Sequence, residues 1–171
     1  MFSNSSAQYE RQSIDTVVAF TPGTKQTSGQ TPAFFPKNIV GVPDPRADTA
    51  VPVTDPRSVC SIGYGGTITV GFSNHVVVDG PGADFTVFEN AFLFSSTRTY
   101  AEPATVEVSR DGIIYKLFPY NTQTLVGCAG VTPVYGKADP FDPLQSGGDA
   151  FDLADVGLDS IRYIRISDIT S

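Results

Sequence analysis

Short stretches of the chain alternate between hydrophobic and polar residues, which is the pattern of half-buried β-strands. Residues 67–72 place Ile68, Val70 and Phe72 on one face and threonine or glycine on the other. Residues 104–117 repeat the alternation on both sides of an Asp-Gly pair, which predicts two strands joined by a tight turn. These two regions are the clearest local signals, and both predict antiparallel strands.

Weaker patterns add further strands and one helical segment. Residues 84–94 are apolar on both faces, which predicts a single central strand. Only residues 147–158 have helical spacing, and they predict one short helical turn near 151–156. The remaining strands are expected at residues 16–20, 75–79 and 161–167. Many short strands separated by Gly/Pro turns favour an all-β fold, an antiparallel β-sandwich.

Residues 21–58 are rich in proline, glycine and threonine, which excludes long helices there. Their aromatic residues Phe34 and Phe35 indicate an ordered loop that packs against the core rather than a disordered linker. Residues 1–13 are polar and predict a loose lead-in. The expected organisation is therefore one β-sandwich domain over residues 14–171.

Composition and charge exclude several classes of protein. The chain has 171 residues, 40% of them hydrophobic, which fits one domain with a sizeable core. Its net charge is −7 and its 11 Lys and Arg residues are scattered, so we expect no nucleic-acid partner. No apolar run is long enough to span a bilayer, so we expect no membrane insertion.

The two cysteines and the N-terminus bear on the compartment. Cys60 and Cys128 are compatible with one disulfide or with two buried free thiols. In an oxidising compartment we predict that the two are bridged. The N-terminal residues lack the apolar core of a signal peptide. Either the protein is cytoplasmic, or a signal peptide has been removed.

Two acidic clusters are the main candidates for chemistry. The stretch "DGPGADFTVFEN" carries Asp79, Asp84, Glu89 and Asn90 around one hydrophobic strand, with glycines that allow carbonyl groups to turn inward. A second cluster at three-residue spacing contains Asp149, Asp152 and Asp155, within the segment 147–158 that has helical spacing. Calcium prefers six to eight oxygen ligands of these types in an irregular shell.

We therefore predict a Ca²⁺ site that uses Asp79, Asp84, Glu89, Asn90, Asp149 and Asp152. A structural explanation exists for two of these residues: Asp79 could form a turn, and Asp152 could cap a helix. Glu89 is harder to explain structurally, because a strand that is apolar on both faces should not carry an unpaired charge. A pair of carboxylates could also hydrolyse glycosidic bonds, with Glu89 acting together with Asp84 or Asp152.

Several segments, taken in order, resemble a family. "SVCSIGYGGTITVGF", "GPGADFTVFENAF", "PATVEVSRDGIIY", "CAGVTPVY" and "GGDAFDLADVGLDSIRYIRISD" look like the bacterial "cell surface protein" domain of secreted proteins that carry PEP-CTERM or type IX secretion sorting tails. The resemblance covers most of the chain and implies a secreted or surface-displayed, jelly-roll-like β-sandwich without known catalytic activity. Two departures are the absence of a sorting tail after Ser171 and the presence of Cys60 at a position where an aliphatic residue is expected.

The resulting functional hypothesis is a non-enzymatic extracellular or cell-surface module, stabilised by calcium, for adhesion, glycan binding or surface assembly. Its partners would be glycans or other surface proteins, and its oligomeric state is not specified by the sequence. The alternatives are a carboxylate-based glycoside hydrolase on the same scaffold and a self-assembling subunit of a surface filament or layer. Four aromatic residues are candidates for stacking on sugar rings: Phe34, Phe35, Tyr64 and Tyr135.

Overall fold

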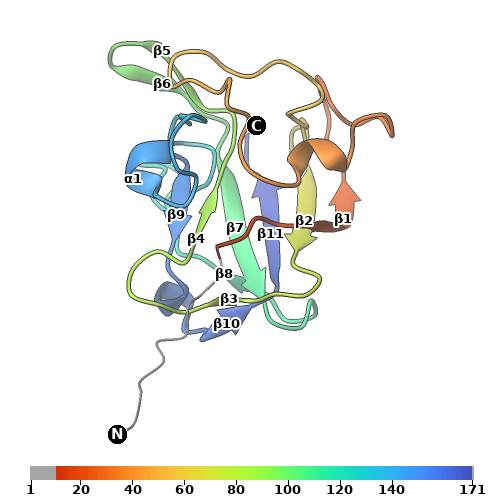
Figure 1. Cartoon of the computed structure of the whole chain (residues 1–171), viewed down its shortest axis with the longest axis vertical. Helices are drawn as coiled ribbons and strands as arrows, with labels where there is room; N and C mark the ends of the chain where they lie inside the picture. The colour runs from red at the N-terminus through yellow and green to blue at the C-terminus, as the bar shows by residue number, and fades with distance from the viewer. Residues whose placement is uncertain (1–10, 171) are drawn as a thin grey trace, which may run out of the picture.

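A five-stranded antiparallel sheet forms the centre of the computed structural model, which describes residues 11–170 (Figure 1). Its strands, in spatial order, are β1 (Thr16–Thr21), β2 (Thr67–Gly71), β11 (Tyr163–Asp168), β7 (Ala104–Ser109) and β8 (Lys116–Leu117). Most of the predicted lead-in, residues 1–10, lies outside the described residues. The all-β, antiparallel prediction is confirmed.

The alternating residues of the three central strands form the inner face of this sheet. Ile164 of β11 is in register with Val70 of β2 on one side and with Val108 of β7 on the other. The next inward row joins Ile68 and Val106 in the same way through Ile166. Because successive residues of a strand point to opposite faces, this register buries one apolar set.

A second layer of short strand pairs covers the inner face. β4 (Phe85–Val87) pairs with β9 (Asp149–Phe151), and β3 (Val77–Val78) pairs with β10 (Ser160–Ile161). Phe151, Leu153 and Ile161 from this layer join the buried core of the sheet. A separate hairpin, β5 (Phe92–Ser95) with β6 (Arg98–Tyr100), lies at the opposite end of the molecule from β3 and β10 (Figure 1). The finer expectation of a jelly roll stays a prediction.

The prediction of one continuous strand over residues 84–94 is wrong. The segment forms β4, leaves regular structure between residues 88 and 91, and continues as β5 in a different strand pair. The apolar residues of this segment therefore belong to two different strand pairs, β4 with β9 and β5 with β6. The return strand after the Asp-Gly turn is also shorter than predicted, because Ile113 and Ile114 are exposed and only β8 pairs with β7.

Between residues 11 and 170, helical structure is confined to short turns. η2 (Leu153–Val156) confirms the predicted turn near 151–156, and the Asp152 side chain caps it by accepting from the Ala154 amide at 2.9 Å. Residues 149–151 are a strand rather than part of that turn. Two further short helices, η1 (Lys37–Ile39) and α1 (Pro143–Ser146), were not predicted. No helix within residues 11–170 has the length and apolar character needed to cross a membrane.

The proline-rich segment is an ordered loop that packs against the sheet. Phe35 contacts Phe20 of β1, with ring centroids 4.9 Å apart. The side-chain amide nitrogen of buried Asn38 lies 2.7–3.0 Å from three carbonyl oxygens, which share its two N–H groups and belong to Gly29, Pro56 and Val59. Side-chain hydrogen bonds of this kind replace the backbone ladder that prolines interrupt.

The two cysteines are not bonded to each other. Cys60 lies in the segment that pairs with residues 24–30 beside the β1–β2 edge, where the Ser61 amide donates to the Ser28 carbonyl. Cys128 is buried beside β7, toward the opposite edge of the sheet, next to Ala129, which pairs with Ala104 of β7. The disulfide prediction is therefore corrected: the two thiols belong to segments separated by the width of the sheet.

Candidate functional site

The β4–β9 pair brings two of the predicted ligands together. Its last register pair is Phe85 opposite Phe151, so Asp84 and Asp152 face each other one residue further out. The Asp84 amide donates to the Phe151 carbonyl at 2.8 Å, which continues the ladder to this point. Backbone pairing, rather than helical spacing, thus sets the distance between the two carboxylates.

Hydrogen bonds orient both side chains. The two oxygens of Asp84 accept from the Gly80 amide at 2.7 Å and from the Leu153 amide at 2.8 Å, which joins the 79–84 turn to the start of η2. Only one carboxylate oxygen of Asp152, Oδ1, accepts the capping hydrogen bond of η2, and Oδ2 takes no part in it. Asp152 therefore has the capping role predicted for it, whereas the turn-forming role predicted for Asp79 falls on Asp84.

Asp79 completes a triad of carboxylates. It follows β3, and its amide donates to the carbonyl of Asp159 at 3.0 Å. One oxygen each from Asp79, Asp84 and Asp152 lie within 4.8 Å of one another. Desolvation, together with the charges of Asp84, Asp152 and Asp159, raises the pKa of the Asp79 carboxyl. Among residues 11–170, no Lys or Arg forms an ion pair with the triad.

The other three predicted ligands lie elsewhere. Asp149 stands at the far end of β9 from Asp152, about 10 Å away along an extended strand of three residues. Asn90 instead pairs with the backbone of Val53: its amide nitrogen donates to the Val53 carbonyl and its oxygen accepts from the Val53 amide, both at 2.9 Å. The expected convergence of six ligands fails because residues 149–151 form a strand and residues 84–94 are interrupted.

Asp149 serves as an acceptor for a neighbouring loop. Its carboxylate accepts from the Val131 amide at 3.0 Å, from the Thr132 amide at 3.2 Å and from the Thr132 hydroxyl at 2.7 Å. These neutral donors favour the ionised form, but burial outweighs them and raises the pKa of Asp149. The residue is therefore a part-buried carboxylate without a cationic partner in the described structure.

Glu89 has a strongly raised pKa. It is half-buried, and no hydrogen bond or ion pair reaches its carboxylate within residues 11–170. Burial, followed by the charges of Glu102, Asp149 and Asp168, raises the pKa of Glu89 to about 7. Glu89 lies beyond one end of β4 and Asp84 beyond the other, so the two do not form the facing pair that a glycoside hydrolase requires.

The four candidate aromatic residues have different environments. Phe34 is half-buried, and Phe35 packs on Phe20. The ring of Tyr64 is covered by the Lys25 ammonium, 4.7 Å from its centroid. Tyr135 is the exposed one, with 39% of its surface accessible. Tyr135 therefore offers the most accessible ring of the four candidates.

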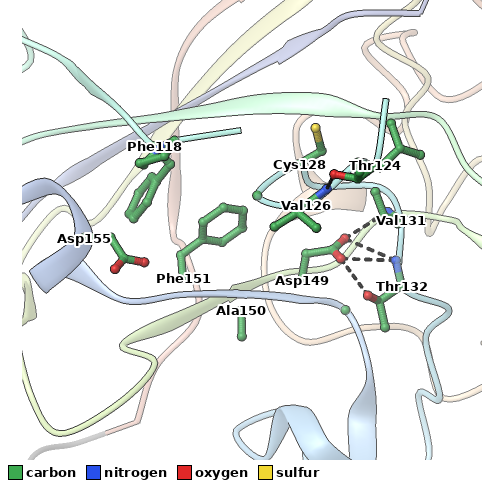
Figure 2. Close-up of a pocket in the computed structure, with 14 residues that line it drawn as sticks. Phe118, Thr124, Val126, Cys128, Val131, Thr132, Asp149, Ala150, Phe151 and Asp155 are labelled. Atoms are coloured by element: carbon green, nitrogen blue, oxygen red, sulfur yellow. Dashed lines mark hydrogen bonds between the residues drawn. The ribbon is translucent and has the colours of Figure 1, made fainter. Parts of the chain in front are cut away.

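A cleft of about 600 Å³ lies beside β9 and was not predicted from the sequence. This β9 cleft is lined by Phe118, by the 124–128 loop, by Val131 and Thr132, by β9 and by Asp155 of η2 (Figure 2). Its walls come from segments far apart in the chain, and no local motif marks them. Only the acidic spacing around Asp149 and Asp155 was visible in the sequence.

No protein-family model, curated protein or solved structure matches the chain.

Proposed function

We propose that this protein is a non-enzymatic, extracellular or cell-surface β-module in which Asp79, Asp84 and Asp152 bind a calcium ion. The observation that carries the proposal is the approach of these three carboxylates to within 4.8 Å of one another. In this role the module serves adhesion, glycan binding or surface assembly, as the resemblance to secreted surface domains implies.

The chemistry of the triad favours a divalent cation. Three carboxylates gathered without a basic partner repel one another, and the raised pKa of Asp79 reflects this repulsion in part. A dication would replace repulsion with attraction. Calcium suits the irregular arrangement better than magnesium, which requires near-ideal octahedral geometry and retains its waters.

The position of the triad indicates what the ion would do. Asp79 follows β3, Asp84 precedes β4 and Asp152 caps η2, so one ion would join three segments of the second layer. With only three carboxylates and an exposed Asp79, the affinity should be modest. Extracellular calcium modules work with dissociation constants of about 10⁻⁴ to 10⁻³ M, which matches such a site.

The test is a set of thermal melts in chelator and in about 10 mM calcium. This concentration exceeds the expected dissociation constants about tenfold to a hundredfold, so binding should stabilise the fold by about 1.4–2.7 kcal/mol. For a domain of this size that raises the melting temperature by about 3–10 °C. Asp79→Asn should lose most of this response, since it removes charge from the exposed corner of the triad and leaves the hydrogen bonds of Asp84 and Asp152 in place.

Asp139→Asn is the matched control. Asp139 is an exposed acid paired with Arg11 and outside the triad, so this variant should retain the full calcium response. Equal loss in both variants would indicate general charge screening rather than a site. Superimposable wild-type melts in calcium and in chelator would overturn the proposal.

A further inference from the structure

The β5–β6 hairpin is joined to the body of the protein by two unequal segments. The returning segment, residues 101–103, is fixed by its backbone, because the Glu102 amide donates to the Gly130 carbonyl at 3.1 Å. The outgoing segment, residues 88–91, makes no backbone–backbone hydrogen bond within residues 11–170. Since a two-stranded hairpin is only marginally stable by itself, its position depends on how the outgoing segment is held.

Hydrogen bonds tie the outgoing segment and β5 to the proline-rich loop rather than to the central sheet. The Asn90 side chain pairs with the Val53 backbone through two hydrogen bonds of 2.9 Å. The Leu93 amide of β5 donates to the Thr49 carbonyl at 2.6 Å. Because opening exchanges such hydrogen bonds for bonds to water, each of them contributes only modestly to holding the hairpin in place.

The Glu89 side chain lies between the two segments. Gly130 has a φ of +79°, and the position that a Cβ would take there is 3.7 Å from the Glu89 Cγ and 2.2 Å from the Glu102 carbonyl oxygen. Glu89 therefore lies against the same residue that anchors the returning segment. The side chain is half-buried, and within the described residues its carboxylate has no hydrogen bond or ion pair. The outgoing segment thus rests on the body through an acid without a partner there.

The charged groups that act on Glu89 come from three elements and are all acidic: Glu102 on the returning segment, Asp149 on β9 and Asp168 at the end of β11. Both aspartates accept hydrogen bonds from backbone amides, so neither side chain is free to turn away. Within residues 11–170, no Lys or Arg forms an ion pair with Glu89 or Glu102. Ionised Glu89 would be a partly desolvated charge among like charges, and burial with these neighbours raises its pKa to about 7.

We propose that Glu89 is a pH-dependent switch for the β5–β6 hairpin: in its protonated form it holds the outgoing segment against Gly130, and in its ionised form it releases that segment. The hairpin stands at one end of the molecule and carries the exposed aromatic side chains Phe94 and Tyr100, so its opening changes how these rings are presented (Figure 1). Asp84 lies beyond the other end of β4, so the switch is separate from the calcium triad and does not depend on the proposed function.

The direction of the pH effect follows from linkage. The closed hairpin binds a proton at Glu89 more tightly than an open one, in which the pKa of the side chain returns to its ordinary value of 4.5. Opening is therefore least favourable below pH 4.5 and becomes more favourable as the pH rises through 7. Between pH 5 and pH 8 the equilibrium constant for opening should increase about 70-fold.

The experiment is native-state hydrogen exchange of the isotope-labelled protein, followed by NMR in chelator between pH 5 and pH 8 and corrected for intrinsic exchange rates. The reporter is the Leu93 amide, and the Phe118 amide, which donates to the Val106 carbonyl at 3.0 Å, is the reference for the core. Protection of Leu93 should be lower than that of Phe118 and should fall about 70-fold over this pH range. Low concentrations of urea should speed exchange at Phe118 but not at Leu93, because opening of the hairpin exposes little surface.

Two variants test the acidic groups. Glu89→Gln should reduce the fall in protection to less than about threefold, because the amide has the shape of the protonated acid and does not ionise. Glu102→Gln should reduce the fall only in part, since burial acts on Glu89 even without this neighbour. An undiminished fall in Glu102→Gln would contradict the contribution of like charge across the two segments.

Asp139→Asn is the matched control. Asp139 is an exposed acid paired with Arg11 and outside the hairpin, so this variant should keep the full fall in protection. An equal fall in Glu89→Gln would assign the pH effect to another group and overturn the proposal. A Leu93 amide that follows the urea dependence of Phe118 at every pH would also overturn it, because the hairpin would then open only when the whole domain unfolds.

Discussion

Asp84 and Asp152 face each other across the end of the β4–β9 pair, one residue beyond the register pair Phe85–Phe151. Asp84 immediately precedes β4 and Asp152 immediately follows β9, and each carboxylate accepts from a backbone amide of η2. The end of the β4–β9 pair therefore places two negatively charged carboxylates close together. Asp79 adds to that charge from the end of β3.

Glu89 should make the protein less stable as the pH rises. The pKa of Glu89 is about 7 in the folded protein against 4.5 for the free side chain, so between these values the folded state binds the extra proton. Stability is then greatest near pH 4.5 and falls as the pH rises through 7, by about 3 kcal/mol for this group. Urea unfolding at pH 5 and pH 8 should show this fall, and Glu89→Gln should remove most of it.

A site-specific titration provides the control for Glu89. The carboxyl carbon signal of Glu89 should titrate with a midpoint near 7 in the native protein. A midpoint near 4.5, or a wild-type stability that increases between pH 5 and pH 8, would contradict the effect of burial and of its three acidic neighbours.

Asn90→Ala should loosen the proline-rich loop at Val53. The substitution removes both 2.9 Å hydrogen bonds between the two residues, which we expect to cost about 1–2 kcal/mol of unfolding free energy. Hydrogen exchange should become faster at the Val53 amide. Asn74→Ala, at another exposed asparagine, is the control and should leave the exchange of Val53 unchanged. Unaltered exchange in both variants would mean that the pairing contributes nothing in solution.

Both cysteines should be free and slow to react. Alkylation of the unreduced, denatured protein should modify two thiols, since the residues are not bonded. In the native protein at pH 8 the reaction should be more than about tenfold slower, because burial raises the pKa of Cys60 to about 11 and also raises that of Cys128, while the thiolate is the reacting species. Failure to alkylate either thiol after denaturation would restore the disulfide.

Val106→Asp should abolish cooperative folding. Val106 is 1% exposed at the centre of the inner face, so the substitution would bury a charge without a partner. Val18→Asp places the same side chain on β1 at a position that is 52% exposed, and it should cost less than about 1 kcal/mol. Thermal unfolding followed by circular dichroism distinguishes them, and a cooperative transition in Val106→Asp would contradict the described core.

Alternation in the sequence was sufficient to predict the central strands but not their neighbours. Ile68, Val70 and Val106 alternate with polar residues, and a period of two has one structural interpretation. Residues 84–94 lack that alternation, and an apolar run on both faces describes a central strand and a segment crossing between two strand pairs equally well. The hydrophobic pattern of residues 84–94 therefore did not predict the interruption at residues 88–91.

The candidate site was predicted in part for a related reason. The three-residue spacing of Asp149 and Asp152 fits one face of a helix, but in a strand it places the two at opposite ends. Asp84 and Asp152, by contrast, are 68 residues apart and meet only through strand pairing. The sequence shows that there are two cysteines but not how far apart they lie in the fold, so it could not predict their separation across the sheet.

The central position of β11 in the sheet has a consequence for how the chain is made. β2 and β7 pair with β11 and not with each other, and β11 begins at residue 163, nearly a hundred residues after β2. During synthesis both strands therefore leave the ribosome with one edge unpaired and wait for β11. Folding that depends on such distant contacts is slow, and the waiting edges are open to association with other chains. A chaperone that shields them until residue 168 emerges would increase the yield of folded protein.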